Sequence, residues 1–215
     1  MPRRTAFKIV AVLVLVAGCA AAPLPLEGES EADAAAAVPF NELGSADAPI
    51  LMIEFSDLQC SFCARHASQT FPELRRNYID TGKLRYAVRD LPLPTHRHAV
   101  PAAVAVRCAG EQGKFWEFRQ AIYLARGRLD QQPYAAIAGE LGLDVERFEA
   151  CRRDDRQLAK VRADAALAAG EGISATPAFV IGRMVGGEFT GETIVGAKPY
   201  AVFAAKIDAL LGEPR

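Results

Sequence analysis

The chain has 215 residues, of which 51% are hydrophobic and 24% are charged, and its formal net charge is −1 at pH 7. No basic cluster follows Lys8, so the chain lacks the electrostatic footprint of a nucleic-acid-binding protein, and we expect no nucleic acid among its partners. The length suffices for one compact domain with an insertion.

The N-terminus has the pattern of an export signal. An apolar stretch, 9–17, follows the basic residues Arg3, Arg4 and Lys8. The stretch is shorter than the roughly 20 apolar residues that a membrane-spanning helix needs. We therefore expect the chain to be exported into a compartment where disulfides persist.

The apolar stretch ends in Val16-Ala17-Gly18-Cys19, which resembles the signal of bacterial lipoproteins. In those proteins the cysteine carries lipid and becomes the first mature residue. Ordinary cleavage among 20–22 is the alternative, and it would discard Cys19. We expect residues 1–18 to be a signal peptide of the lipoprotein type, with lipid at Cys19 attaching the protein to a membrane.

Residues 19–37 are predicted to form a flexible tether. The segment contains prolines and alanines, and no large apolar residue follows Leu26. It also carries an acidic run: Glu27, Glu29, Glu31 and Asp33. Such a segment cannot bury enough apolar surface to order itself, and it would hold a folded domain away from a membrane.

The remaining chain alternates between strand and helix patterns. A buried strand is expected at 50–55, a helix at 60–78 with a kink at Pro72, and a second strand at 84–88. Alanine-rich helices follow, at 99–108, 115–126, 133–141, 145–151 and 155–169. Strands are then predicted at 178–181 and 184–185, joined by a turn at Gly182-Arg183, before a last helix at 200–211. This order predicts a mixed α/β fold.

Two cysteines lie at the first strand-to-helix junction, Cys60 and Cys63. A thiol at a helix N-terminus is favoured as a thiolate, the nucleophile of disulfide exchange. A lone C-x-x-C also fits half a zinc site. The strand before the pair, the helix after it and the later Thr176-Pro177 favour redox chemistry. Three scattered histidines, His66, His96 and His98, do not complete a zinc site, so we expect no metal.

The chain contains five cysteines, an odd number that would leave one thiol unpaired. If Cys19 carries lipid, the other four form two natural pairs, Cys60 with Cys63 and Cys108 with Cys151. We expect the second pair to be a structural disulfide between two helices. A second redox relay is the alternative, although neither cysteine has a C-x-x-C partner.

Three stretches resemble the DsbA-like branch of thiol–disulfide oxidoreductases, within the thioredoxin superfamily. They are GSADAP at 44–49 with IEFSDLQCSFC at 53–63, LPTH at 93–96 with CAGEQGKFW at 108–116, and GISATPAF at 172–179. The resemblance, which covers 43–211, implies a thioredoxin-like fold with an inserted α-helical domain. The thioredoxin-like domain would comprise 38–94 and 171–215, and the insertion 95–170.

The resemblance also implies roles for single residues. Cys60 would be the sulfur that attacks, and that is attacked, in disulfide exchange. The Thr176–Pro177 peptide bond would be cis, and its loop would face Cys60 and bind substrate. Ser61 and Phe62 would tune the pair. Since the best-known members carry Pro-His there and Phe62 has no charge, helix N-terminal amides must stabilise the Cys60 thiolate, and we expect a moderately low pKa. Glu54 would pass a proton to or from Cys63; a salt bridge at the sheet edge is the alternative.

These inferences predict a protein-disulfide oxidoreductase of the cell envelope, lipid-anchored on the periplasmic side, that needs no cofactor. Its partners would be exported cysteine-containing proteins and a membrane redox partner that reoxidises or reduces Cys60–Cys63. We expect an oxidase. A reductase or isomerase of the same fold remains open, as does a redox-inactive thioredoxin-like lipoprotein that binds other molecules or carries a metal.

Overall fold

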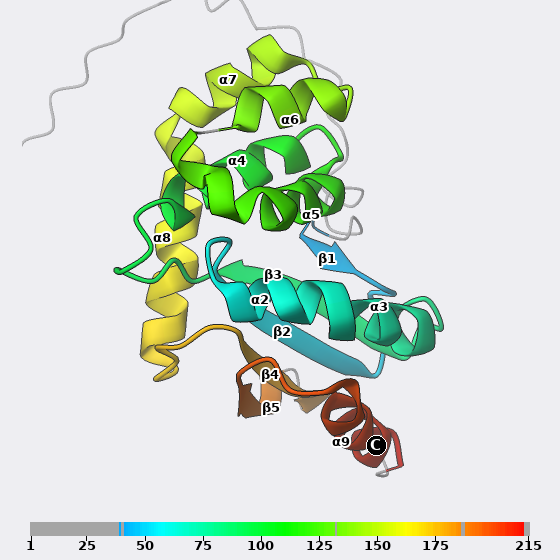
Figure 1. Cartoon of the computed structure of the whole chain (residues 1–215). Coiled ribbons are helices and arrows are strands. Elements are labelled where there is room, and N and C mark those ends of the chain that lie inside the picture. The colour runs from blue at the N-terminus through cyan, green and yellow to red at the C-terminus, as the bar shows by residue number, and fades with distance from the viewer. Residues whose placement is uncertain (1–38, 40, 132, 186–187, 213–215) are drawn as a thin grey trace, which may run out of the picture. The chain divides into compact units, whose positions relative to one another are not determined.

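The computed structural model describes residues 39, 41–131, 133–185 and 188–212 (Figure 1). The predicted signal peptide, Cys19 and the tether lie outside these residues. No helix among the described residues is long and apolar enough to cross a membrane. The prediction of a mixed α/β fold with an inserted helical region is confirmed, because the sheet and the added helices are both present.

Five strands form one mixed sheet in the order β1-β3-β2-β4-β5. The strands are β1 (Glu42–Leu43), β2 (Ile50–Ser56), β3 (Leu84–Asp90), β4 (Ala178–Val185) and β5 (Glu188–Val195). β2 and β3 are parallel, and every other pair is antiparallel. β2 is therefore the central strand, and the loop that follows it lies at the middle of one end of the sheet.

The predicted turn at Gly182-Arg183 is wrong. β4 continues through both residues, and Gly182 pairs with Gly191 of β5. A Cβ added at Gly182 would lie 1.9 Å from the carbonyl oxygen of Thr190, so a close approach between two strands requires the glycine. The strand β5 was not predicted, because its glycine and polar residues hide the alternation of a strand.

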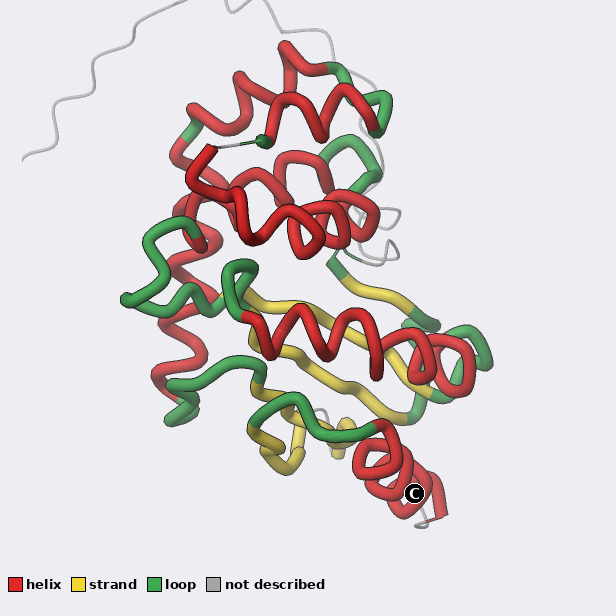
Figure 2. The backbone as a smooth tube through the Cα atoms, in the orientation of Figure 1, coloured by secondary structure: helices red, strands yellow, loops and turns green. Residues whose placement is uncertain are grey.

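One face of the sheet is covered by a continuous helical run between β2 and β3 (Figure 2). The run comprises α2 (Ser61–Arg65), the π-helical η1 (His66–Thr70), α3 (Phe71–Leu74) and the π-helical η2 (Arg75–Ile79). Pro72 occupies the first turn of α3, and the wider π turns flank it, so the chain stays helical past the proline. The last helix, α9 (Tyr200–Gly212), packs beside α3.

Alternation along β2 separates the two faces of the sheet. Met52 contributes to the larger core under the helical run, whereas Phe55 belongs to a smaller cluster on the other face. Helix α8 (Asp155–Gly170) covers that second face, with Ala168 packed into the smaller cluster. On α9, Phe203 is buried, whereas its neighbour Val202 is 43% exposed.

The inserted helices stack next to the end of the sheet that carries the C-x-x-C motif (Figure 1). They are α4 (Ala99–Gly110), α5 (Phe115–Ala125), the 3₁₀ turn η3 (Arg126–Gln131), α6 (Tyr134–Glu140) and α7 (Val145–Arg153). Asp144 and Asp154 accept hydrogen bonds from backbone N–H groups at the starts of α7 and α8, which fixes where these helices begin. Cys108 of α4 and Cys151 of α7 form a disulfide that joins two helices of this region.

Replacing Cys108 and Cys151 together with alanine is expected to lower thermal stability without changing disulfide exchange at Cys60. The bond closes a loop with a sequence separation of 43, which corresponds to about 4 kcal/mol on the chain-entropy model. The melting temperature, followed by circular dichroism, should fall by several degrees. An unchanged melting temperature together with lost turnover would instead identify this pair as a redox relay.

Candidate active site

The two cysteines of the C-x-x-C motif meet the sheet at the end of its central strand. Cys60 is the N-cap of α2, with extended backbone (φ −71°, ψ 124°), and Cys63 lies one turn later. Cys60 is 6% exposed and Cys63 is fully buried. Both are free thiols in this structure. Only the first sulfur is therefore within reach of another protein.

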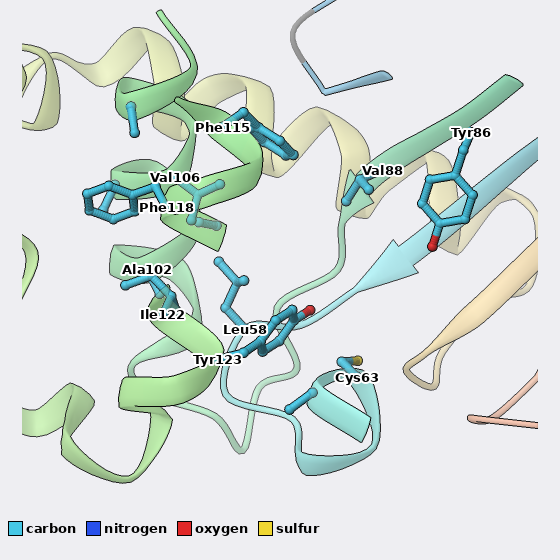
Figure 3. Close-up of a cluster of buried hydrophobic side chains, with 14 of the residues drawn as sticks. Leu58, Cys63, Tyr86, Val88, Ala102, Val106, Phe115, Phe118, Ile122 and Tyr123 are labelled. Carbon is cyan, nitrogen blue, oxygen red and sulfur yellow. The ribbon is translucent and has the colours of Figure 1, made fainter. Parts of the chain in front are cut away.

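The second sulfur lies beneath the helical insertion. Figure 3 shows Cys63 on α2. The side chain of Leu58 and that of Tyr123, which extends from α5, lie on the side of Cys63 that faces the insertion. The backbone N–H of Asp57 donates a hydrogen bond to Cys63 Sγ at 3.5 Å. Cys63 is thus enclosed by protein and can react only with its neighbour Cys60.

The pKa values of the two thiols are driven apart. The pKa of Cys60 falls from 9.0 to about 5, because the Cys63 thiol and the backbone N–H groups of Cys63 and Phe62 donate to its thiolate and outweigh the opposing effect of burial. The pKa of Cys63 is raised by burial, by its hydrogen bond to Cys60 and by the negative charge of Glu54. The first thiol is a thiolate at neutral pH and the second is protonated.

Thiolate absorbance and iodoacetamide alkylation of the reduced protein are expected to rise with pH around a midpoint near pH 5 and to change little between neutrality and the ordinary value of 9.0. The Cys60 thiol should increase the free energy of unfolding of the reduced protein as pH rises from about 5 to 9.0. Over that range this thiol binds more protons in the unfolded chain than in the folded one. Mass spectrometry should place the alkylation on Cys60, with Cys63 unmodified. A midpoint close to 9.0 would contradict the assignment.

Asp57 fixes the loop that carries Cys60. Its Oδ1 accepts hydrogen bonds from the backbone N–H of Gln59 at 2.7 Å and of Cys60 at 3.1 Å. Its Oδ2 accepts one from the N–H of Leu93 at 2.8 Å and lies 2.8 Å from His96 Nδ1. Sequence reasoning missed this role, although an aspartate at a strand-to-helix turn commonly accepts such bonds. No group of metal-ligating side chains that could hold an ion occurs in the described part of the chain.

Glu54 lies on the sheet face that supports α2, and it is fully buried. The Tyr86 hydroxyl and Arg119 Nη2 each donate to its Oε2 at 2.7 Å. Burial would raise the pKa of Glu54, but the Arg119 guanidinium overcomes this and holds it below 4.5. Glu54 Oε1 is buried and has no hydrogen-bond partner among the described residues. The carboxylate is thus ionised, with one oxygen available.

The alternative that Glu54 occupies the sheet edge is wrong, because β2 lies between β3 and β4. The ion pair itself is present. Arg119 comes from α5, 65 residues away, and its Nη2 also lies 3.3 Å from Ser56 Oγ and 3.2 Å from the Tyr123 hydroxyl. The contacts of Glu54 and its neighbours with Tyr86, Tyr123 and Arg119 were not predicted from the sequence, because these residues belong to elements that are distant in the chain.

His66 extends this buried network. Its Nε2 lies 3.1 Å from the Tyr86 hydroxyl, which donates its proton to Glu54, so Nε2 is the donor. The ring packs against Phe179 and Phe203, with centroids 4.5 and 5.5 Å away. Burial lowers the pKa of His66 to about 4. The imidazole is therefore neutral at neutral pH and adds no charge near Cys63.

The loop before β4 faces Cys60. The Thr176–Pro177 peptide bond is cis, and Cys60 Sγ lies 3.6 Å from the Thr176 carbonyl oxygen. Pro177 is held in turn by a 2.7 Å bond from the N–H of Gly196 to its carbonyl oxygen. Ser61 and Phe62, which follow Cys60, are exposed. The fold therefore gathers the predicted residues of the C-x-x-C motif and the proline loop, whereas Cys108–Cys151 belongs to the insertion.

Comparisons with known proteins agree with this geometry. The family described as thioredoxin matches residues 41–196. The crystal structure of alpha-DsbA1 from Wolbachia pipientis has a TM-score of 0.72 and 31% identity, covering 80% of this chain and 90% of that one. DsbA2 from Pseudomonas aeruginosa has a TM-score of 0.63 and 26% identity, covering 81% and 95%.

A curated relative has a different name. The Na(+)/H(+) antiporter NhaA of Herminiimonas arsenicoxydans is 36% identical over 152 residues, which are 70% of this chain and 24% of the relative. This chain spans about a quarter of the length of the curated relatives that it matches. The name describes those longer proteins as wholes, so it assigns no transport activity to this chain.

The family match, the paired cysteines of unequal exposure and the cis-proline loop lead to the same classification. The match spans more than half of the chain, and the solved structures cover the sheet together with the inserted helices. The chain belongs to the thioredoxin superfamily, in the DsbA-like branch of thiol–disulfide oxidoreductases.

Proposed function

We propose that this protein is an extracytoplasmic thiol–disulfide oxidoreductase that donates a Cys60–Cys63 disulfide to exported cysteine-containing proteins. The observation that supports an oxidase is the pKa of Cys60, lowered to about 5. A stabilised thiolate stabilises the reduced protein, and this makes the disulfide a stronger oxidant. Since two sulfur atoms hold the electrons, the reaction needs no cofactor.

The exchange proceeds in two steps. A substrate thiolate attacks Cys60 Sγ, the Cys60–Cys63 bond breaks, and Cys63 leaves and takes up a proton. The second substrate thiolate then attacks the substrate sulfur of the mixed disulfide, and Cys60 leaves as a thiolate. Two electrons pass from the substrate to the protein. The low pKa of Cys60 makes it the better leaving group in the second step.

Three further groups serve this exchange in our proposal. Glu54, ionised at rest, accepts the proton of Cys63 when a membrane redox partner reoxidises the pair and passes it on to water. When Cys63 leaves as a thiolate, Glu54 relays a proton from water to it. The backbone of Thr176, beside cis-Pro177, binds an extended substrate segment as an added strand would. Ser61 and Phe62 flank the approach to Cys60. They carry no charge that could stabilise its thiolate. The hydrogen bond from the Cys63 thiol contributes most to the low pKa of Cys60, and the backbone N–H groups expected from the sequence contribute less.

The reduction potential of Cys60–Cys63, measured by equilibration with glutathione, tests the direction of electron flow. We expect a value nearer to the strong oxidants, at about −120 mV, than to cytosolic thioredoxin, at about −270 mV. A potential close to thioredoxin would overturn the oxidase and favour the reductase. A chain whose Cys60 can be alkylated without any loss of activity would be a binding protein instead.

We also propose that lipid at Cys19 anchors the protein on the periplasmic side of a membrane, with 19–37 as the tether. The run Val16-Ala17-Gly18 before Cys19, which resembles the lipoprotein signal, supports the proposal. The mature protein should partition into detergent and carry lipid at Cys19, whereas Cys19→Ser should stay unprocessed or be released. A mature N-terminus beyond Cys19 would overturn this anchor.

A further inference from the structure

A cleft of about 680 Å³ lies between the helical run that begins at α2 and the inserted helix α5. It extends along one side from Ser61 to Arg75 and along the other from Gly113 to Arg126. Figure 1 shows α5 lying alongside α2 and α3. Ser61 directly follows Cys60, so one end of the cleft reaches the residue after the cysteine, although Cys60 itself does not line it. Thr176, which faces Cys60 from the proline loop, does not line it.

The polar lining of the cleft carries excess positive charge. Arg65, Arg75 and Arg126 line it and are exposed. A fourth guanidinium, Arg119, is neutralised by Glu54. Among the described lining residues Glu117 is the only acid, and it lies 3.1 Å from Lys114.

The three exposed guanidinium groups keep most of their charge available. Arg65 Nη2 donates to the carbonyl oxygen of Ala197 at 3.2 Å, and Arg126 Nη1 to that of Tyr123 at 3.4 Å. Carbonyl oxygens do not neutralise a cation. Arg75 Nε lies 3.5 Å from a carboxylate oxygen of Asp80, but this pair is half exposed and therefore weak. Arg75 also interacts with the charge of Glu117, more weakly than Lys114 does.

The cleft also offers apolar surface between these charges. Phe71 and Trp116 stack in parallel across it, with ring centroids 5.6 Å apart. Leu124 is 80% exposed at its border. A ligand that combines carboxylates with apolar side chains would therefore complement this lining.

We propose that this cleft binds an acidic, partly apolar segment of the protein whose cysteine reacts with Cys60. The inference rests on the proposed function and adds a substrate preference to it. An extended chain advances about 3.3 Å per residue, so residues a short distance from a cysteine held at Cys60 reach the cleft. Arginine–carboxylate pairs at its border accelerate encounter and select among partners.

The cleft contains its own reporter, because Trp116 is the only tryptophan of the chain. An extended peptide in which glutamates alternate with leucines, with serine in place of cysteine, is titrated into the purified protein while Trp116 fluorescence is followed. We expect a saturable change that high salt abolishes, because the ion pairs are exposed. The matched peptide with glutamines should bind about tenfold more weakly.

The charge-reversed variant Arg75→Glu/Arg126→Glu should lose the preference for the glutamate peptide. Its control is Arg153→Glu/Arg162→Glu, which changes the net charge equally at exposed residues of α7 and α8 and should bind as the parent does. Circular dichroism verifies that both variants are folded. Equal binding of the two peptides, or an unchanged preference in the Arg75→Glu/Arg126→Glu variant, would overturn the proposal.

The same peptides with two cysteines restored separate this proposal from the proposed function. Faster oxidation of the glutamate peptide by the parent, and not by the charge-reversed variant, supports both. If both peptides are oxidised at equal rates, the proposed oxidoreductase activity is supported and the proposed preference of the cleft is refuted. Glutamate-dependent binding at Trp116 without any exchange retains the cleft as a binding site and removes the proposed function.

Discussion

Cys60→Ser is expected to abolish transfer of a disulfide to a reduced test protein, whereas Cys63→Ser is expected to accumulate mixed disulfides through Cys60. Cys60 carries the thiolate and keeps 6% of its surface exposed, while Cys63 is fully buried and protonated. Without Cys63, no thiol inside the protein resolves the adduct on Cys60. The adducts form with oxidised glutathione or a disulfide-bonded substrate, and mass spectrometry of digested protein locates them.

The Cys108→Ala/Cys151→Ala variant is the control for this experiment, because it removes two sulfurs away from the reactive pair. It should form the Cys60–Cys63 disulfide and transfer it at the parent rate once folded. Adducts that map to Cys63 would reverse the roles of the two sulfurs. Residual transfer by Cys60→Ser would show that a different thiol reacts.

Arg119→Met is expected to destabilise the protein by about 3–5 kcal/mol at neutral pH, because it leaves the Glu54 carboxylate buried without its partner. The loss should shrink as pH falls. With Arg119 the pKa of Glu54 is below 4.5, so the ion pair stabilises the protein above that value. Without Arg119, burial raises the pKa, and protonation at acidic pH removes the unpaired charge.

Denaturant unfolding of the variants at several pH values measures the effect. Glu54→Gln combined with Arg119→Met should recover part of the lost stability, since it removes the orphaned charge. Arg156→Met is the matched control: its partner Asp154 is on the surface, and the unfolding midpoint should not move. If the loss of unfolding free energy in Arg119→Met does not depend on pH, Arg119 stabilises the protein through packing and not through its charge.

Local patterns accounted for much of the fold. The predicted strand at 50–55 corresponds to β2, Ile50–Ser56, and the helix at 155–169 to α8, Asp155–Gly170. The first prediction depends on a run of apolar residues and the second on a helical pattern, and both are local properties of the chain. The turn predicted at Gly182-Arg183 failed because a glycine indicates a turn and a close approach between strands equally well.

The sequence by itself located the candidate pair: a C-x-x-C motif that follows a buried strand and starts a helix indicates which sulfur caps the helix and which is buried. The later Thr176-Pro177 could be assigned to the same site only through the family resemblance. Only the tertiary structure decided the surroundings of the pair. Arg119 meets Glu54 across 65 residues, and Asp57 meets His96 across 39. Such contacts form because strand order and the packing of α5 bring distant residues together, and no local periodicity encodes that geometry.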